Sequence, residues 1–271
     1  MAIRPDDPAG VMKFKDRYYG GRALIVLGGP SGADWRKIRD EIKPDVILAA
    51  NGNLDVGAEF WMLAENMNYQ YRMMVDGKTE QIRARGRDFM RLLEQENTAR
   101  VKLISCLSWN LLDLYGIDKS NCVCVRRLCE VTIDHFPDKF SLREYGDGFL
   151  NGPVIQHIEG VQKSVRFNVG TVGVHLLHFA GILGCAEAHT IGMDFCFKGS
   201  KHHWYPHPRY MEDRFRTEKM FTQYNGIPTL WEWVEGAEWL KSIESIFKRD
   251  GLKWTDHSKG LFQSMGLECA S

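Results

Sequence analysis

Short apolar runs that stop abruptly at glycine or asparagine turns are the feature of this sequence that most limits its fold. Ala23–Leu27 is wholly apolar and is followed at once by Gly28-Gly-Pro-Ser-Gly32. Asp45–Ala50 is closed in the same way by Asn51-Gly-Asn53. Such runs are typical of parallel strands buried on both faces, and helix-length segments between them indicate βαβ units. The predicted fold is α/β, a Rossmann-like, mostly parallel sheet with helices on both faces.

The same patterns extend along the chain, and the middle is less regular. Helices are expected over 34–42, 56–66, 83–96, 171–183, 211–224 and 235–249, and further strands over 71–75, 101–105, 122–125, 188–192 and 252–255. Segment 108–168 contains prolines and a glycine-rich turn, and it is interpreted as an irregular insertion or lid. The predicted organisation is an N-terminal arm over 1–22, one domain over 23–260 and a tail over 261–271.

Composition excludes several classes of protein. The 271 residues carry 35 basic and 35 acidic side chains, which argues against a protein whose main task is gripping nucleic acid by counterion release. A polynucleotide substrate stays open. No apolar run reaches the roughly 18 residues that a membrane-spanning helix needs, so no membrane span is expected. The N-terminus lacks the apolar core of a secretory signal, so a cytoplasmic location is expected.

The cysteines favour reduced thiols. There are seven, an odd number, in a chain that is neither short nor signal-bearing, so a disulfide framework is not expected. Cys122, Cys124 and Cys129 form the one cluster, and their spacing does not match a zinc knuckle. Cys122 and Cys124 alternate along a predicted strand, which favours small buried side chains.

The carboxyl ends of parallel strands are where open sheets bind ligands, and polar or glycine-rich features follow several of them. The turn of Gly28, Gly29, Pro30 and Ser31 could hold phosphate through a serine donor and free amides, or could simply be a tight turn. Asn51 ends the next strand, where its amide could read a base or a sugar or only form the turn.

Two further features lie in the second half of the chain. Gly170-Thr-Val-Gly173 opens a helix that is rich in small residues, which suits either a ligand or close helix packing. Asp194 follows the predicted strand 188–192, and a loop with His202, His203 and Tyr205 comes next. Histidine titrates near neutral pH and suits general acid–base catalysis, although a polar surface loop has the same composition.

The order of these motifs resembles a superfamily of known enzymes. Strand-Gly-Gly-Pro-Ser31, strand-Ala-Asn51, Gly170-Thr-Val-Gly173 and Thr190-Ile-Gly-Met-Asp194-Phe occur in that order. The combination resembles the bacterial sialyltransferases of the lipooligosaccharide type and the 6-hydroxymethylpterin pyrophosphokinase-like (motility accessory factor) domains. The late segment Asp256-His-Ser-Lys-Gly260 resembles the terminal element of both, and His203-Trp-Tyr-Pro206 is closer to the second.

The resemblance implies a nucleotide site. Gly28, Gly29, Pro30 and Ser31 would face phosphates or ribose, Asn51 the nucleotide, and Gly170, Thr171 and Gly173 the phosphate or base, with Asp194 at the floor. The expected function is a nucleotide-dependent transferase, with a glycosyltransferase as the first choice. His203 or His202 would act as the base, and Tyr205 and Lys201 would stabilise the leaving phosphate.

Two alternatives accompany that expectation. One is an ATP- and Mg²⁺-dependent pyrophosphokinase acting on a pterin-like alcohol, with Asp76 and Asp194 as metal ligands. The other is a nucleotide-binding protein without turnover. The expected cofactor is therefore a nucleotide-sugar donor or ATP, with Mg²⁺ in the second case. The acceptor is open between a glycan, a small alcohol and, with less support, DNA, and the sequence is compatible with a homo-oligomer.

Overall fold

The structure is a computed structural model. It describes residues 11, 13–63, 97–105, 109, 112–113, 116–125, 141–144, 153–158, 161–166, 172–198, 204, 221–230, 233–234, 236–238, 240–241, 244, 248 and 251–266. No helix in these ranges combines the length and the apolar character needed to cross a bilayer.

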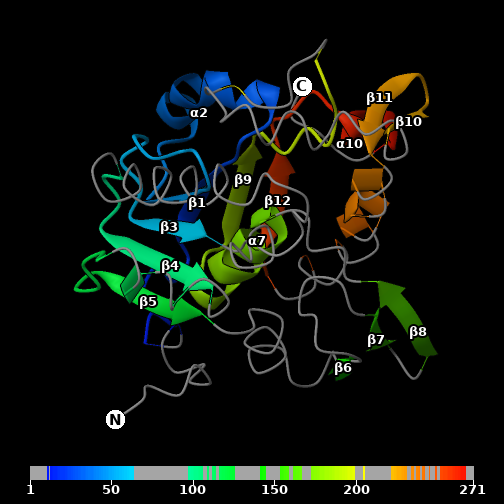
Figure 1. Cartoon of the computed structure of the whole chain (residues 1–271). Coiled ribbons are helices and arrows are strands. Elements are labelled where there is room, and N and C mark those ends of the chain that lie inside the picture. Colours follow the sequence, from blue (N-terminus) through cyan, green and yellow to red (C-terminus); the bar gives the residue numbers. More distant parts are fainter. Residues whose placement is uncertain are drawn as a thin grey trace, which may run out of the picture.

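A seven-stranded, all-parallel sheet forms the body of the molecule (Figure 1). Its strands are β1 (Arg22–Val26), β2 (Val46–Ala50), β3 (Phe60–Leu63), β4 (Val101–Ser105), β5 (Cys122–Val125), β9 (Glu187–Ile191) and β12 (Lys253–Asp256). Their order across the sheet is β12-β9-β1-β2-β3-β4-β5. The predicted α/β class is confirmed, and so are the strands expected over 23–27, 45–50, 101–105, 122–125, 188–192 and 252–255.

The strand order reverses at β1. From β1 the chain proceeds outward to β5, and it then returns to place β9 and β12 on the other side of β1. Ile25 on β1 therefore pairs with Leu48 of β2 on one side and with Thr190 of β9 on the other. In an open parallel sheet, the crevice outside the carboxyl ends at such a reversal is where ligands bind.

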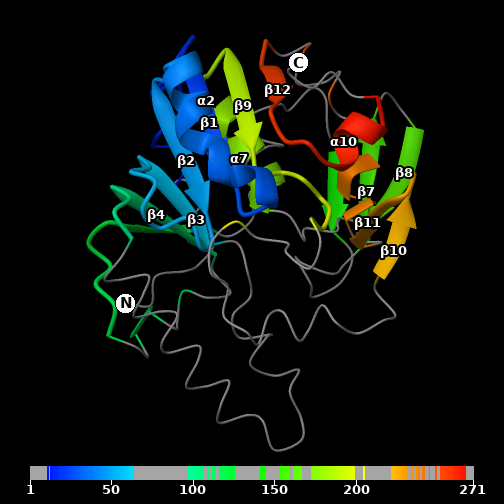
Figure 2. The same cartoon turned by 90° about the horizontal axis from the view of Figure 1, so that it is seen from above.

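Helices cover both faces of the sheet (Figure 2). On one face, α7 (Val172–Ile182) packs with the first core cluster, which includes Ile25 and Phe60. Nearly every residue of α7 is buried, His175 and His178 included, so the helix presents no exposed polar face. On the other face, η1 (Pro30–Asp34) leads into α2 (Trp35–Ile42), which buries Trp35 and Ile38 in the second cluster.

The helix expected over 56–66 is wrong where it can be compared. Residues 60–63 form β3, which pairs with β2 and β4 in the middle of the sheet. Phe60, Trp61, Met62 and Leu63 are all almost wholly buried. A short run that is apolar on every side has no period of its own, so a buried strand and a buried helix look alike in the sequence.

The irregular insertion predicted over 108–168 contains several short strands. Its first described strand, β5, is the edge of the main sheet. Further on, β6 (Ser141–Glu144), β7 (Pro153–Ile158) and β8 (Val161–Arg166) form a separate antiparallel sheet. On β5 the valines are buried and Cys122 and Cys124 are half-buried, so the thiols lie on the less covered side of the strand.

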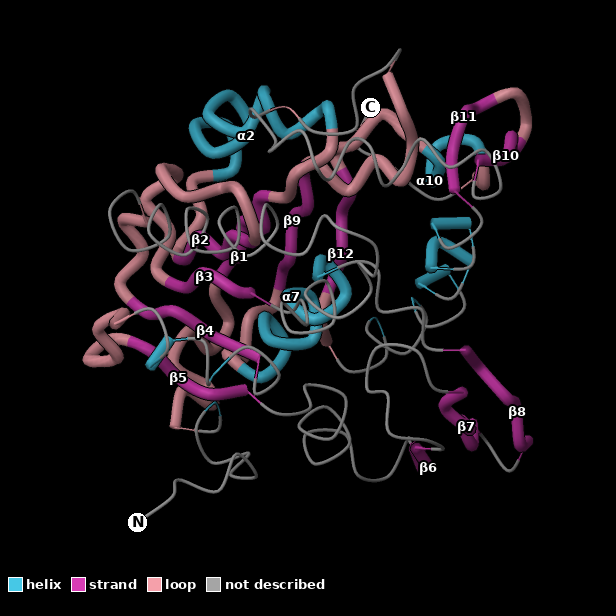
Figure 3. Tube along the Cα trace, viewed as in Figure 1, coloured by secondary structure: helices cyan, strands magenta, loops and turns pink. Residues whose placement is uncertain are grey.

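The carboxyl-terminal third also differs in part from expectation. The end of the helix expected over 211–224 is wrong, because β10 (Phe221–Tyr224) and β11 (Ile227–Leu230) form an antiparallel hairpin (Figure 3). Within the helix expected over 235–249, the described residues are helical, and helical residues already occur at 233 and 234. In α10 (Leu261–Ser264), Leu261 and Phe262 are buried in the first core cluster, so the folded body continues past residue 260. The expected strand 71–75 and helix 83–96 lie outside the described residues.

Candidate functional site at the strand-order reversal

The turns after β1 and β9 are joined beyond the ends of the two strands. The amide of Leu27 donates to the Ile191 carbonyl at 2.8 Å, and the amide of Gly29 donates to the Gly192 carbonyl at 2.8 Å. The glycine-rich turn that the sequence singled out therefore lies directly against the turn that carries Asp194. Residues 28–31 and 192–194 are brought together as the carboxyl edge of the reversal.

Ser31 and Asp194 form the centre of this junction. The Ser31 hydroxyl donates to Asp194 Oδ2 at 2.8 Å, and the Ser31 amide donates to the same oxygen at 3.1 Å. The amide of Gly192 donates in turn to the Ser31 hydroxyl oxygen at 3.0 Å. Asp194 is only 4% exposed. The two residues predicted to serve the same nucleotide site are thus in direct contact.

The glycines of the turn are needed because other parts of the same chain pack closely against them. A Cβ on Gly29 would lie 2.3 Å from Asp194 Oδ2, and one on Gly192 would lie 2.2 Å from the Leu27 carbonyl oxygen. Gly192 also has a φ of +81°, a region that favours glycine. A Cβ on Gly32 would lie 2.4 Å from the indole of Trp204. The tight-turn interpretation therefore accounts for these glycines without a ligand.

The electrostatics of Asp194 reflect its burial. Removal from water raises the pKa of the Asp194 carboxyl above its ordinary value, while the two Ser31 donors and the charge of Lys198 oppose that rise. The Asp194 carboxylate already accepts the hydrogen bonds of the Ser31 amide and hydroxyl, and it therefore occupies the position that a bound anion would take.

A second buried carboxyl lies on the neighbouring strand and was not among the predicted site residues. Asp256, at the end of β12, accepts a hydrogen bond from the Thr190 hydroxyl at 2.7 Å and is 4% exposed. Burial raises the pKa of Asp256 to about 7, although hydrogen bonds from Thr190 and Ser258 oppose the rise. The signal that could have found it is a strand that ends in an acidic residue.

The segment after Asp256 supports the Asp194 turn from the other side. The amide of Met193 donates to the Ser258 hydroxyl oxygen at 2.8 Å, and the amide of Leu261 donates to the Asp194 carbonyl at 2.9 Å. A Cβ on Gly260 would lie 1.9 Å from that carbonyl oxygen, so this position has no room for any other residue. The residues 258–261 and the turn after β1 hold Asp194 between them.

Two asparagines end β2 at the same edge of the sheet. Asn51 has a φ of +52°, a conformation that asparagine tolerates in turns. Asn53 is 1% exposed, and its Nδ2 donates to the Val26 carbonyl at 3.2 Å and to the Ala50 carbonyl at 2.8 Å. Within the described part of the chain, the Oδ1 atoms of both residues are buried and meet no hydrogen-bond donor. The sequence predicted a role for Asn51 and noted Asn53 only as part of the turn.

The remaining predicted site residues divide into two groups. Gly173 is described and lies in α7, where a Cβ would be 2.4 Å from Met193 Cε and 2.6 Å from Leu27 Cδ1, so close helix–sheet packing accounts for it. Asp76, Gly170, Thr171, Lys201, His202, His203 and Tyr205 lie outside the described residues. Trp204 is described, and its amide donates to the Gly28 carbonyl at 3.0 Å.

The described part of the chain contains no preformed metal site. Across those residues, no group of three or more histidine, cysteine, aspartate or glutamate side chains is arranged to hold a metal ion. Asp194 and Asp256 are the acidic side chains buried at this edge.

Comparison of the chain with known protein families, with curated proteins and with solved structures finds no match.

Proposed function

We propose that this protein is a nucleotide-dependent transferase, and that it moves a sugar from a nucleotide-sugar donor to an acceptor hydroxyl. The observation that carries the proposal is the direct contact of Ser31 with Asp194 where the strand order reverses. Ligands of doubly wound sheets bind at this point of the fold, and a buried carboxyl held there by serine is suited to chemistry.

The asparagine oxygens support a nucleoside at the β2 end of the edge. Buried acceptors that lack a donor are costly, and binding of a group with N–H or O–H donors would relieve that cost. A base with an exocyclic amino group, or a ribose with its hydroxyls, supplies such donors. Asn51 and Asn53 would then select the nucleoside, and the phosphates would extend toward Ser31.

Phosphate and the Asp194 carboxylate compete for the same donors. Both are acceptors, so a phosphate can use the Ser31 amide and hydroxyl only when Asp194 releases them. Burial already raises the pKa of Asp194, which lowers the cost of protonating it when a second anion arrives. Binding of the nucleotide-sugar is therefore expected to be accompanied by uptake of a proton at Asp194.

In the proposed reaction, His203 or His202 removes the proton of the acceptor hydroxyl. The acceptor oxygen forms a bond to the anomeric carbon of the donor, and the bond from that carbon to the phosphate oxygen breaks. The electron pair leaves with the nucleotide phosphate, whose charge Tyr205 and Lys201 would stabilise. These roles are predictions from the sequence.

Diphosphoryl transfer from ATP is the second candidate, and the position of Asp194 favours it. A carboxylate next to a phosphate is repulsive unless a cation lies between them, and Mg²⁺ bound by one or two carboxylates is a common solution. Asp194, with Asp76 as the predicted partner, would hold such an ion. The acceptor in that case is the hydroxyl of a pterin-like alcohol.

Nucleotide binding is tested first by thermal shift. The panel consists of cytidine, uridine, guanosine and adenosine nucleotides and their available sugar conjugates. Asn51→Gly removes the amide and keeps the positive φ, so it should fold and lose most of the shift. Asn225→Gly is the matched control, because Asn225 has a φ of +50° in the β10–β11 turn. Equal shifts for both variants would contradict the proposed nucleoside site.

Turnover then separates the three functions. Hydrolysis of a nucleotide-sugar without added metal, lost in His203→Gln, supports glycosyl transfer. AMP released from ATP only with Mg²⁺, and lost in Asp194→Asn, supports diphosphoryl transfer instead. Binding without turnover of any donor would leave a nucleotide-binding protein and would overturn both enzyme proposals.

A further inference from the structure

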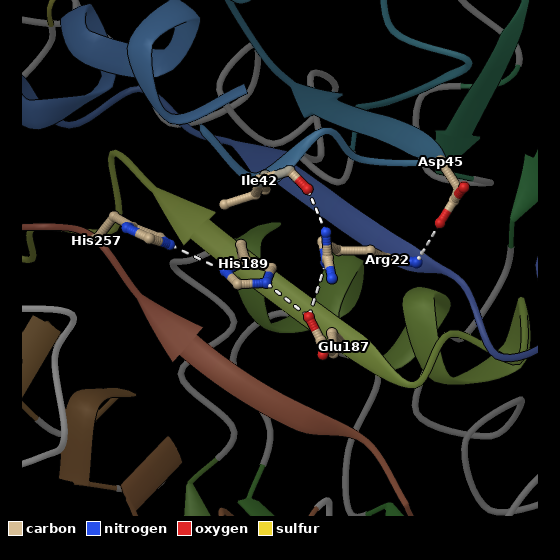
Figure 4. A network of polar contacts seen from close by, with 6 residues as sticks. All are labelled: Arg22, Ile42, Asp45, Glu187, His189 and His257. Atoms are coloured by element: carbon tan, nitrogen blue, oxygen red, sulfur yellow. Dashed lines mark hydrogen bonds and ion pairs between the residues drawn. The ribbon is translucent and has the colours of Figure 1, made fainter. Parts of the chain in front are cut away.

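A pair of histidines joins β9 to the segment that follows β12. Nδ1 of His189 lies 2.9 Å from Nε2 of His257, and the two rings are 5.2 Å apart between centroids (Figure 4). Both side chains are partly buried, with that of His189 13% exposed. The nitrogens face each other, so one of them must donate and the other must accept.

A chain of ionic contacts decides which nitrogen donates. Glu187 Oε2 accepts from Arg22 Nε at 2.7 Å and lies 3.3 Å from His189 Nε2. Arg22 is itself held by the Ile42 carbonyl and, through its amide, by Asp45 at 2.8 Å. Hydrogen bonding to Arg22 lowers the pKa of Glu187, which is therefore a carboxylate that accepts a hydrogen bond from the N–H at His189 Nε2. Neutral His189 must then accept at Nδ1, and His257 must donate from Nε2.

This arrangement tolerates one added proton and not two. A proton on His257 Nδ1 leaves the bond between the rings intact, because Nε2 still donates. A second proton can go only to His189 Nδ1, which then places two N–H groups and two positive charges against each other. The hydrogen bond is lost at that point and becomes a repulsive contact.

The surroundings favour loss of protons from both rings. The pKa of His189 is lowered chiefly by burial and also by the charges of Arg22 on β1 and Lys253 on β12, against the opposing carboxylate of Glu187. The pKa of His257 is lowered by burial and by His189, against Glu41 on α2. A lowered pKa means that the folded pair is fully favourable above the ordinary value of about 6.5 and loses stability as the pH falls.

Successive residues of a strand face opposite sides of the sheet, so the residues next to the two histidines connect the pair to the Asp194 turn. Thr190 and Asp256, the sequence neighbours of the two histidines, are bonded to each other on the opposite face of the sheet. The amide of His257 donates to the Thr190 carbonyl at 2.8 Å and forms the last rung between β9 and the chain after β12. Ser258, the next residue, accepts from Met193, and Leu261 holds the Asp194 carbonyl.

We propose that His189 and His257 form a proton-operated latch that keeps segment 257–261 seated against β9 and so sets the position of Asp194. The latch is closed while the two rings share no more than one added proton, and it opens when both are charged. Opening frees the rung at His257 and the supports that Ser258 and Leu261 give to residues 193 and 194. This device acts on the fold itself, so it stands independently of the reaction catalysed.

Amide hydrogen exchange read by NMR tests the latch. The probes are the amides of Met193, His257 and Leu261, and the reference is the amides of β1, which report global opening. After correction for the intrinsic pH dependence of exchange, lowering the pH from about 7.5 to about 5 should speed the probe amides roughly tenfold relative to the reference, the equivalent of one pKa unit.

Three variants distinguish the latch from general acid destabilisation. His257→Gln retains an N–H donor for His189 and cannot become a cation, so its probe amides should stay protected at both pH values. His257→Ala should exchange fast at both. Lys259→Gln, an exposed change in the same segment, should behave as the wild type. A wild type without a pH response in the probe amides, or an equal response in His257→Gln, would overturn the proposal.

Discussion

The hydroxyl of Ser31 donates to the carboxylate of Asp194 at 2.8 Å, and this bond joins residues 163 positions apart at the reversal of the strand order. Ser31 also accepts from the amide of Gly192, so a single hydroxyl of the turn after β1 bonds two groups of the turn after β9. The turn after β1 and the turn after β9 are consequently one structural unit, and changes to it should be felt in stability as well as in ligand binding.

Ser31→Ala should destabilise the protein by about 1 to 3 kcal/mol, because it removes a hydrogen bond to a buried carboxyl and leaves the Gly192 amide without its acceptor. Urea denaturation at pH 7 measures the change. Ser120→Ala is the matched control, since Ser120 makes the same two kinds of bond to Asp118, a carboxylate exposed to solvent. An effect in the control as large as that at Ser31 would show that burial of the junction is irrelevant.

Gly192→Ala should be far more damaging than Gly226→Ala, although the two glycines have nearly the same φ, +81° and +80°. A Cβ at Gly226 meets open space, so only the left-handed backbone is penalised, by about 1 to 2 kcal/mol. At Gly192 the Cβ would overlap the Leu27 carbonyl, which should add several kcal/mol or prevent folding. Thermal unfolding of both variants tests this, and similar melting temperatures would show that the turn is looser than described.

Asn53→Asp should be more destabilising than Asn53→Ala at pH 7. The side-chain amide donates to the Val26 and Ala50 carbonyls, and a carboxylate in its place would be buried facing two acceptors. A cost of about 3 kcal/mol or more is expected for the aspartate, and it should shrink near pH 4 as the carboxyl protonates and regains a donor. Asn225→Asp, in an exposed turn, serves as the control for introduction of the charge.

Asp256→Asn should stabilise the protein at alkaline pH and not at acid pH. Because the folded pKa is raised to about 7, the native state binds more protons than the unfolded chain, and the contribution of Asp256 to stability falls as the pH rises through the window from about 4 to about 7. The asparagine keeps the acceptor for Thr190 without the charge. The difference between variant and wild type should grow across that window by up to roughly 4 kcal/mol.

His175 makes the difference measurement necessary. Burial lowers the pKa of His175 to about 4, so stability from this residue is complete above the ordinary value near 6.5 and is lost as the pH falls toward 4. The contributions of His175 and Asp256 to the free energy of unfolding change with pH in opposite directions. A pH profile of the wild type alone would therefore hide both. Asp118→Asn gives a control of opposite sign to Asp256→Asn, because its serine bonds lower the pKa of Asp118. A pH-independent difference for Asp256→Asn would contradict the raised pKa.

The local pattern of the chain was enough to find most strands of the sheet. Apolar runs such as 23–27 and 45–50, each stopped by a turn, are typical of parallel strands buried on both faces, and the turns after them mark the carboxyl edge wherever each strand lies. It failed for Phe60–Leu63, because a short segment that is apolar on every side carries no period. It also passed over Asn53 and Asp256, whose importance comes from burial that their neighbours in sequence do not reveal.

The pairing of segments that are distant in the sequence cannot be read from local patterns. The amino-acid pattern establishes that strands exist, that their turns are polar or glycine-rich and that the class is α/β. It does not say that β9 returns to lie beside β1, that Ser31 meets Asp194, or that His189 faces His257. Those pairings depend on the order of the strands, which is selected by the summed burial and hydrogen bonding of the whole sheet and not by any short stretch of residues.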